Sequence, residues 1–471
     1  MRIWWVVLLV VACSKDAKSP PVPAESGASQ QFAGWLAAFN TADQAKLLAY
    51  HEQHFPYDVA SDDVKSVENE LGLARGTGGF EVRKVEESTP TKHTVVMKEK
   101  ASEQHARVSI EVEAAPPHKV TRFEIHPIPT PDDLQPKRVS EAEAIVALRA
   151  ELDRLVARDA FSGAVLVAKH GKTIFAEAYG MADRAQKIKN TLDTKFRIGS
   201  MNKMFTAATT LRLVQEGKLA RDTPLGKVLA DYPNKQVATK VTIHHLLSHT
   251  GGTGDIFGPK FDEKRRELRT LEDYVKLYGD RELEVEPGNF QYSNYGFLLL
   301  GVAIAKVTGK SYYDAVEEHV FEPAGMTATA SLPEDDKVSD RSIGYMHETG
   351  PWVPNTDTLP FRGTSAGGGY STVGDLARFG DALVNHKLVD AAHLKLLTTG
   401  KVDMGPRMKY AYGFTESSGP VRCFGHSGGA PGMNGDLAIC DSGYTIVVLA
   451  NLDPPVANQV SDFIAARLPL R

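Results

Sequence analysis

Ser200 and Lys203 form a Ser-x-x-Lys pair in the segment FRIGSMNKMFTAATTL. Apolar residues recur at helical spacing from Met204 onward, so we expect the pair in the first turn of a helix and on one face of it. A serine hydroxyl is a weak nucleophile until a base accepts its proton. A lysine that is buried near a helix N-terminus is pushed toward its neutral form and can be that base. Ser-x-x-Lys also arises by chance, and serine is a common helix cap, so the pair alone is weak support.

Two further segments carry groups that could act with this pair. Tyr292–Asn294 (YSN) comes just ahead of a strongly apolar run, which predicts a turn that projects a phenol and an amide before a buried helix. His426–Gly428 (HSG) ends a predicted strand and is followed by Gly429. The three segments therefore predict one site built from a helix start, a turn and a strand end.

In this order, Ser-x-x-Lys, Tyr-x-Asn and His-x-Gly resemble the three motifs of the penicillin-recognising serine hydrolases. That family comprises class C β-lactamases, D-Ala-D-Ala carboxypeptidases of the same branch, and related esterases and D-aminopeptidases. The stretches VTIHHLLSHTGG and SAGGGYSTVGDLARFG are also similar to family sequences, and the resemblance covers about residues 155–455. It implies a β-lactamase-like α/β fold, with an antiparallel sheet flanked by helices plus an all-α region.

The resemblance also implies a role for each motif residue. Ser200 would attack an acyl carbonyl, while Lys203 and Tyr292 would handle its proton and titrate as a coupled pair. The backbone N–H groups of Ser200 and Gly429 would form an oxyanion hole, worth about 3 kcal/mol for each donor. The substrate-binding residues would be Asn294, His426, Ser427 and Gly428.

His426 stands where many family members carry lysine. An imidazole with an ordinary pKa of about 6.5 is mostly uncharged at neutral pH, whereas a lysine there would be charged. We therefore expect His426 to favour uncharged substrates, or to make the binding of carboxylates depend on pH. The alternative is that His426 only packs against the neighbouring strand and leaves substrate contacts to Ser427 and the backbone.

No metal ion or other cofactor is expected. His245 and His249 are four residues apart and could ligate zinc from one helix face, but no glutamate stands between them as in HExxH and no third ligand is signalled. The glycine clusters lack the spacing of nucleotide-binding loops.

The first thirteen residues, MRIWWVVLLVVAC, predict an export signal. One Arg precedes about ten apolar residues, too few for a membrane span, and the ending Val-Val-Ala-Cys resembles the lipobox of bacterial lipoproteins. Cys13 would then be lipidated and become the mature N-terminus; the alternative is an ordinary cleaved signal. Ser14 after the cysteine favours the periplasmic face of the outer membrane in a Gram-negative cell.

Cys423 and Cys440 are the two remaining cysteines of three. They flank a Gly/Pro turn and are equidistant from Pro431-Gly432, as partners across a hairpin would be. In an exported, oxidising setting a disulfide is favoured over two free thiols.

The chain divides into five predicted segments. Apolar residues at helical spacing, followed by four alternating runs, predict one or two helices and then about four antiparallel strands with one solvated face. This small α+β unit is loosely similar to the cone-shaped domains of the nuclear-transport-factor-2-like superfamily; it could bind a ligand or only space the next domain from the membrane. The boundaries are signal 1–12, tether 13–29, α+β domain 30–130, Pro-rich linker 131–138 and hydrolase domain 139–471.

The layout of the hydrolase domain follows from its strands. Two strands that turn at His170-Gly171 come early, helices fill the middle, and several strands return near the end. The first and last strands should therefore meet in one sheet.

The composition excludes several classes of protein. Apolar residues make up 42% and the formal net charge is −5 without a basic stripe, which disfavours extensive disorder and nucleic-acid binding. Beyond the first dozen residues no apolar run approaches the roughly 20 residues of a membrane span.

We therefore expect an envelope serine hydrolase, taken to be monomeric, that acts on an amide or ester of a small molecule or peptide through an acyl-Ser200 intermediate. It would be of carboxypeptidase, β-lactamase or esterase type. The alternative is a catalytically vestigial binding protein of the same fold.

Overall fold

The computed structural model describes residues 26–55, 63–347, 351–405 and 407–470. The chain forms two compact units, Met1–Gln135 and Pro136–Arg471. The predicted signal and Cys13 lie outside the described residues. None of the helices formed by the described residues has both the length and the apolar character needed to cross a bilayer.

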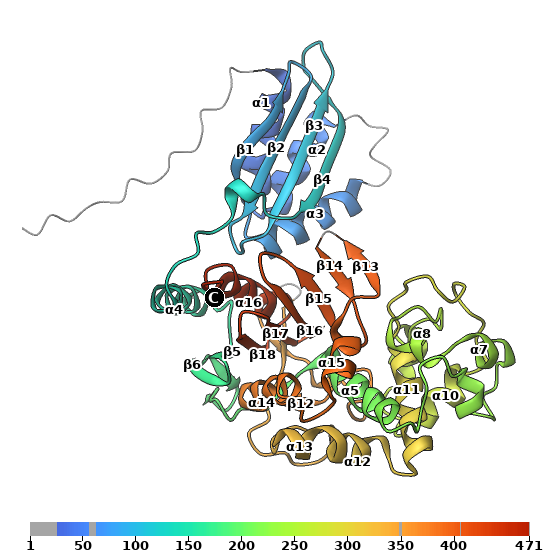
Figure 1. Ribbon diagram of the computed structural model, residues 1–471. Helices are drawn as coiled ribbons and strands as arrows, with labels where there is room; N and C mark the ends of the chain where they lie inside the picture. Colours follow the sequence, from blue (N-terminus) through green and yellow to red (C-terminus); the bar gives the residue numbers. More distant parts are fainter. Residues whose placement is uncertain (1–25, 56–62, 348–350, 406, 471) are drawn as a thin grey trace, which may run out of the picture. The chain divides into compact units, whose positions relative to one another are not determined.

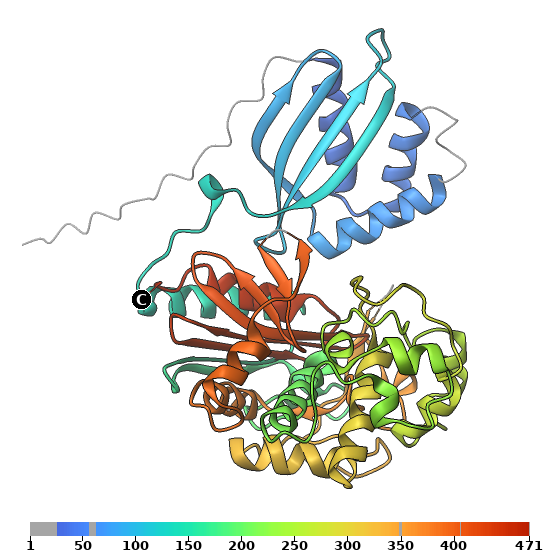
Figure 2. The same cartoon turned by 45° about the vertical axis from the view of Figure 1, so that its right-hand side comes forward.

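The first unit packs three helices on one face of a four-stranded antiparallel sheet of order β1-β2-β3-β4 (Figures 1 and 2). Its elements are α1 (Gly27–Phe39), α2 (Gln44–His54), α3 (Asp63–Thr77), β1 (Phe80–Ser88), β2 (Lys92–Glu99), β3 (His105–Val112) and β4 (Val120–Ile128). The sequence predicted one or two helices. The third, α3, was missed although its buried residues Val67, Leu71 and Ala74 have helical spacing, because charged residues and glycines around them make the segment only weakly apolar.

The core of the first unit lies between the helices and the inner face of the sheet. Trp35 and Phe39 of α1 pack against Met97 of β2 and Val108 of β3, all fully buried. The indole N–H of Trp35 donates to the buried Glu70 carboxylate at 2.9 Å, so the one polar atom of that ring is paired inside the core.

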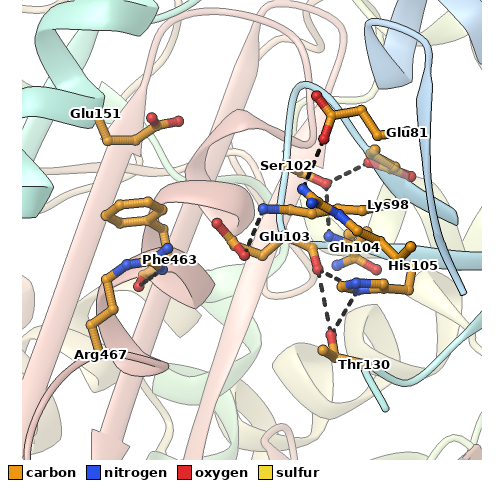
Figure 3. Close-up of polar contacts among 12 residues, drawn as sticks. Glu81, Lys98, Ser102, Glu103, Gln104, His105, Thr130, Glu151, Phe463 and Arg467 are labelled. Carbon is orange, nitrogen blue, oxygen red and sulfur yellow. Dashed lines mark hydrogen bonds and ion pairs between the residues drawn. The ribbon is translucent and has the colours of Figure 1, made fainter. Parts of the chain in front are cut away.

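Polar contacts shape the turn between β2 and β3 (Figure 3). Lys98 and Glu103 form an ion pair of 2.9 Å across it. The Glu103 carbonyl oxygen lies 2.9 Å from Nδ1 of His105 and accepts from the Thr130 hydroxyl at 3.4 Å. The turn is thereby tied to the segment that follows β4.

The second unit is built on an eight-stranded antiparallel sheet of order β13-β14-β15-β16-β17-β18-β5-β6. Its strands are β5 (Gly163–Lys169), β6 (Lys172–Tyr179), β13 (Val402–Gly405), β14 (Met408–Tyr410), β15 (Thr415–Ser418), β16 (Arg422–Ala430), β17 (Met433–Cys440) and β18 (Tyr444–Ala450). The pairing of β18 with β5 confirms that the first and last strands meet in one sheet.

Helices cover both faces of this sheet. On one face α4 (Glu141–Ala157) and α16 (Val456–Ala465) pack against Val165 and Ile446. On the other face Leu166 and Val447 join the larger core, which includes α5 (Asn202–Gln215) and α14 (Val373–Val384). Because both faces are covered, the sequences of β5 and β18 are continuous apolar runs and do not alternate between apolar and polar residues.

The helices that lie between β6 and β13 in the chain make up the helical part of the second unit (Figure 1). They are α5 (Asn202–Gln215), α6 (Leu225–Val228), α7 (Lys235–Lys240), α8 (Ile243–Leu247), α9 (Pro259–Lys264), α10 (Leu271–Tyr278), α11 (Asn294–Thr308), α12 (Tyr312–Val316), α13 (Glu322–Ala324), α14 (Val373–Val384) and α15 (Ala391–Thr398). Helix α5 is buried at every position from Asn202 to Leu211, so it is the central helix of this core. The fold is the predicted antiparallel sheet flanked by helices with a largely helical region.

Two hairpins in the sheet follow the predicted turns. His170 and Gly171, with φ values of 48° and 76°, connect β5 to β6. Pro431-Gly432 connects β16 to β17, and across this hairpin Cys423 pairs with Cys440 and forms a disulfide.

Candidate active site

Ser200 lies in a single 3₁₀ turn, Gly199–Met201, that leads directly into α5. Strand β16 packs against this turn with almost no space between the two backbones. A Cβ added to Gly428 would lie 1.9 Å from the Ile198 carbonyl oxygen and 3.1 Å from the Ser200 nitrogen. Glycine at 428 is therefore required for the strand to reach the serine.

The register of the β16–β17 hairpin sets the direction of the Gly429 N–H. Residues that face each other in antiparallel strands alternate between hydrogen-bonded and non-hydrogen-bonded pairs, and the latter are closer. Cys423 and Cys440 are 4.0 Å apart at Cα, which marks a non-hydrogen-bonded pair, and Gly429 has the same parity opposite Asn434. The Gly429 N–H thus points away from β17. On that side a Cβ on Gly199 would be 3.0 Å from the Gly429 nitrogen.

Lys203 Nζ is fully buried and has three oxygen partners: Ser200 Oγ at 3.1 Å, Asn294 Oδ1 at 2.7 Å and the Ala366 carbonyl at 2.6 Å. A charged ammonium has three N–H donors, one for each partner. A neutral amine has two donors and one lone pair. With the two donors on Asn294 and Ala366, which can only accept here, the lone pair is left for the Ser200 hydroxyl.

Burial lowers the pKa of Lys203 from 10.5 to about 7, while the negative charge of Asp255 acts in the opposite direction. A large fraction of the amine is therefore neutral at physiological pH. Neutral lysine beside a serine hydroxyl is the state that general-base catalysis requires.

Tyr292 lies beside the same pair. Its ring centroid is 4.7 Å from Lys203 Nζ. Burial raises the pKa of the Tyr292 phenol above its usual value, and the nearby Ser200 hydroxyl acts to lower that pKa. Burial is the larger effect, so the phenol is protonated at neutral pH. Within the predicted pair, Lys203 is the group that titrates near neutrality.

Asn294 and Ser293 form the start of α11. Ser293 caps the helix by accepting from the Gly296 N–H at 2.8 Å, which places Asn294 in the first turn. The Asn294 amide nitrogen donates to both carboxylate oxygens of Asp255 at 3.0 Å. Asn294 thus links Asp255 to Lys203, and its predicted contact with substrate remains a prediction.

His426 is buried, and both of its ring nitrogens have protein partners. Nδ1 lies 2.5 Å from the Ser427 carbonyl oxygen and Nε2 lies 3.2 Å from the Tyr410 hydroxyl. Burial, together with the charge of Lys203, lowers its pKa to about 4. The imidazole is therefore neutral at physiological pH, and neither ring nitrogen is free to bind the carboxylate of a substrate. This geometry favours the alternative in which His426 packs within the protein.

A directed hydrogen-bond chain continues beyond His426. His249 Nδ1 accepts from the Ser293 N–H at 3.0 Å, so its proton sits on Nε2, which lies 2.9 Å from the Tyr410 hydroxyl. Tyr410 then donates to His426 Nε2. The His249 ring also packs on Tyr292, with centroids 4.1 Å apart.

Three side chains of this site were missed from sequence: Asp255, His249 in its present role, and Tyr410. Asp255 and His249 belong to the stretch SHTGGTGD, whose beginning resembles the family, and Tyr410 is the last residue of β14. No spacing rule connects them to Ser200, because each reaches the site through packing between distant segments.

His249 is not a helical partner of His245. Helix α8 ends at Leu247, and His249 has a φ of 56°, so the four-residue spacing does not put both imidazoles on one helix face. Within the described part of the chain, no group of three or more His, Cys, Asp or Glu side chains has an arrangement that could hold a metal ion.

Comparison with known proteins agrees with this geometry. The chain belongs to the Beta-lactamase family, whose model matches residues 148–470. PbpX of Bacillus subtilis (strain 168), named as a penicillin-binding protein, is 30% identical over 295 residues, which cover 61% of this chain and 70% of PbpX. The resemblance read from the three motifs is confirmed.

Two solved structures are similar to the second unit. A penicillin binding protein from Bacillus halodurans is 32% identical with a TM-score of 0.60, and the match covers 66% of this chain and 98% of that one. A D-stereospecific amidohydrolase from Streptomyces sp. is 27% identical with a TM-score of 0.57, and the match covers 68% and 97% of the two chains. The predicted β-lactamase-like fold is confirmed.

Proposed function

We propose that this protein is a serine hydrolase that acts on amide or ester substrates through an acyl-Ser200 intermediate. The observation that carries the proposal is the fully buried Lys203 amine, 3.1 Å from the Ser200 hydroxyl and with a pKa of about 7. Such a group can accept the serine proton at neutral pH. The names of the similar amidohydrolase and penicillin-binding proteins support an amide or a β-lactam as the first substrates to test.

The reaction proceeds in two steps, acylation of Ser200 and hydrolysis of the acyl-enzyme. As Ser200 Oγ bonds to the acyl carbon, its proton passes to Lys203 Nζ, and the carbonyl oxygen becomes an oxyanion that accepts from the N–H groups of Ser200 and Gly429. The bond to the leaving group then breaks, and the proton goes to the departing amine or alkoxide. Water, deprotonated by the same amine, then attacks the acyl carbon. The bond between that carbon and Ser200 Oγ breaks, the proton returns from Lys203 to Oγ, and the carboxylic acid leaves.

Covalent labelling tests the proposal. The purified protein is incubated with a fluorescent fluorophosphonate and with a fluorescent penicillin, and the labelled peptide is identified by mass spectrometry. We expect label on Ser200, none in Ser200→Ala, and full label in the control Ser418→Ala, whose serine is exposed on β15. Label from the fluorophosphonate alone indicates an esterase or peptidase. Label from neither refutes the proposal and supports the vestigial binding protein.

We also propose that the protein is exported and anchored to the cell envelope through lipid on Cys13. Support comes from the sequence of the first thirteen residues alone. The intact mass of protein extracted from its own membrane gives the test. A mature chain that begins elsewhere, or that lacks lipid, would contradict the anchor.

A further inference from the structure

Asp255 reaches the catalytic lysine through one intervening side chain. Its two carboxylate oxygens each lie 3.0 Å from Asn294 Nδ2, and Asn294 Oδ1 lies 2.7 Å from Lys203 Nζ. A carboxylate, an amide and an amine therefore stand in a row that ends at Ser200. Asp255 comes from the connection between α8 and α9, and it has no sequence spacing in common with the motif residues.

The carboxylate decides which way the Asn294 amide points. A carboxylate only accepts hydrogen bonds, so it holds the NH₂ group toward itself and turns the amide oxygen toward Lys203. In the reverse orientation the NH₂ would face the lysine N–H groups, and two oxygen acceptors would face each other. Without Asp255, the Asn294 amide loses the partner that keeps its nitrogen away from Lys203 and its oxygen toward Lys203.

The backbone around Asp255 is itself fixed. The Ile256 N–H donates to the Asp255 carboxylate at 2.6 Å. Arg281 donates to the Asp255 carbonyl at 2.5 Å and to the Thr253 carbonyl at 3.2 Å. The first contact fixes the carboxylate and the other two fix the backbone that carries it, so the hydrogen bonds from Asn294 meet a carboxylate that is already held in position.

Asp255 also supplies negative charge where the other titratable neighbours of Lys203 are neutral. Burial lowers the pKa of His249 and of His426, and it raises the pKa of the Tyr292 phenol, so all three are uncharged near pH 7. Asp255 opposes the effect of burial on the pKa of Lys203. Its removal should leave that pKa lower still.

We propose that Asp255 is a positioning residue of this enzyme, acting through the Asn294 amide to hold the Lys203 amine against Ser200. This inference rests on the proposed serine hydrolase function and adds a residue that positions its general base.

The test follows the second-order rate of fluorophosphonate labelling at Ser200 from pH 5 to pH 9. Asp255→Asn keeps the shape of the side chain and one acceptor oxygen but removes the negative charge. Asp255→Ala removes the negative charge and both acceptor oxygens. The control is Asp262→Asn, an exposed acid on α9. Rates are normalised to the folded fraction, so a poorly folding variant does not count as an inactive one.

We expect the acid limb of Asp255→Asn to move to lower pH by on the order of one pH unit, because loss of a nearby opposite charge favours the neutral amine. At pH 6 the rate, relative to its plateau, would then rise from about one tenth to about one half. The plateau rate itself should fall about tenfold in Asp255→Ala, in line with a misplaced general base.

Two results overturn the inference while leaving the proposed function intact. One is an acid limb in Asp255→Asn that coincides with those of the wild type and of Asp262→Asn. The other is an Asp255→Ala plateau equal to that of the wild type. Failure of the wild type to label at all contradicts the proposed function instead.

Discussion

The substitution Lys203→Met tests whether the fold itself holds the pKa of the proposed catalytic base near neutrality. Methionine keeps a long, unbranched side chain in the same buried position and removes the amine. The pKa of Lys203 falls from 10.5 to about 7 on folding because the side chain is desolvated. A depression of about 3.5, at about 1.36 kcal/mol for each pH unit, means that the fold disfavours the charged amine by about 5 kcal/mol.

The sign of the pH dependence follows from the order of the two pKa values. Between pH 7 and 10.5 the unfolded chain holds the lysine proton and the folded chain has lost it, so the free energy of unfolding rises with pH in this window. Below pH 7 both states hold the proton and the penalty is constant. From pH 7 to pH 9 the lysine should add about 2 kcal/mol to stability.

Urea denaturation at pH 7 and at pH 9 gives the free energy of unfolding of the wild type and of Lys203→Met. The contribution of the lysine is the difference between their two changes with pH. We expect the wild type to gain about 2 kcal/mol more than Lys203→Met over this range, since every other group titrates in both. Lys172→Met, in the exposed turn that begins β6, should behave as the wild type does. Equal gains in the wild type and Lys203→Met would mean that the amine is not held near neutrality by burial, and the case for Lys203 as the base would fail.

Three further outcomes are expected. Gly428→Ala puts a Cβ 1.9 Å from a backbone carbonyl oxygen, so Ser200 labelling should be lost with a lower melting temperature, whereas Gly419→Ala, with no contact closer than 3.7 Å, should match the wild type. Replacing Cys423 and Cys440 by serine opens a loop with a sequence separation of 17 and should lower the free energy of unfolding by about 3 kcal/mol in urea denaturation; an unchanged midpoint would contradict this. Because its pKa is lowered to about 4, the His426 ring should show no NMR titration between pH 5.5 and 8, and a midpoint near 6.5 would contradict its burial.

The motif residues were predictable because local rules place them. Three residues of separation puts Lys203 one helical turn from Ser200, and a serine before an apolar run marks the start of α11 next to Tyr292. The equal distance of Cys423 and Cys440 from one turn likewise predicted their register. In each case the spacing along the chain determines the distance in space.

The remaining groups were not predictable, since their partners come from segments far away in sequence. Asp255 and Tyr410 have ordinary local contexts, and only the packing of α11 and of β14 brings them to the site. The role expected for His426 came from comparing the His-x-Gly motif with the lysine that many family members carry at its first position. That comparison cannot reveal that the Tyr410 hydroxyl already has a hydrogen bond with Nε2 of the imidazole.

The pairing of β5 with β18 also governs when the protein can fold. Lys169 pairs with Tyr444 near the other end of the chain, and β5 is apolar on both faces. A growing chain therefore exposes this strand until β18 has been synthesised, and such non-local pairing makes folding slow. A polypeptide truncated before Tyr444 would still contain Ser200, Lys203 and Gly429. It would lack β18, the strand that joins β17 to β5, so we expect such a truncation to be as harmful as loss of the proposed nucleophile.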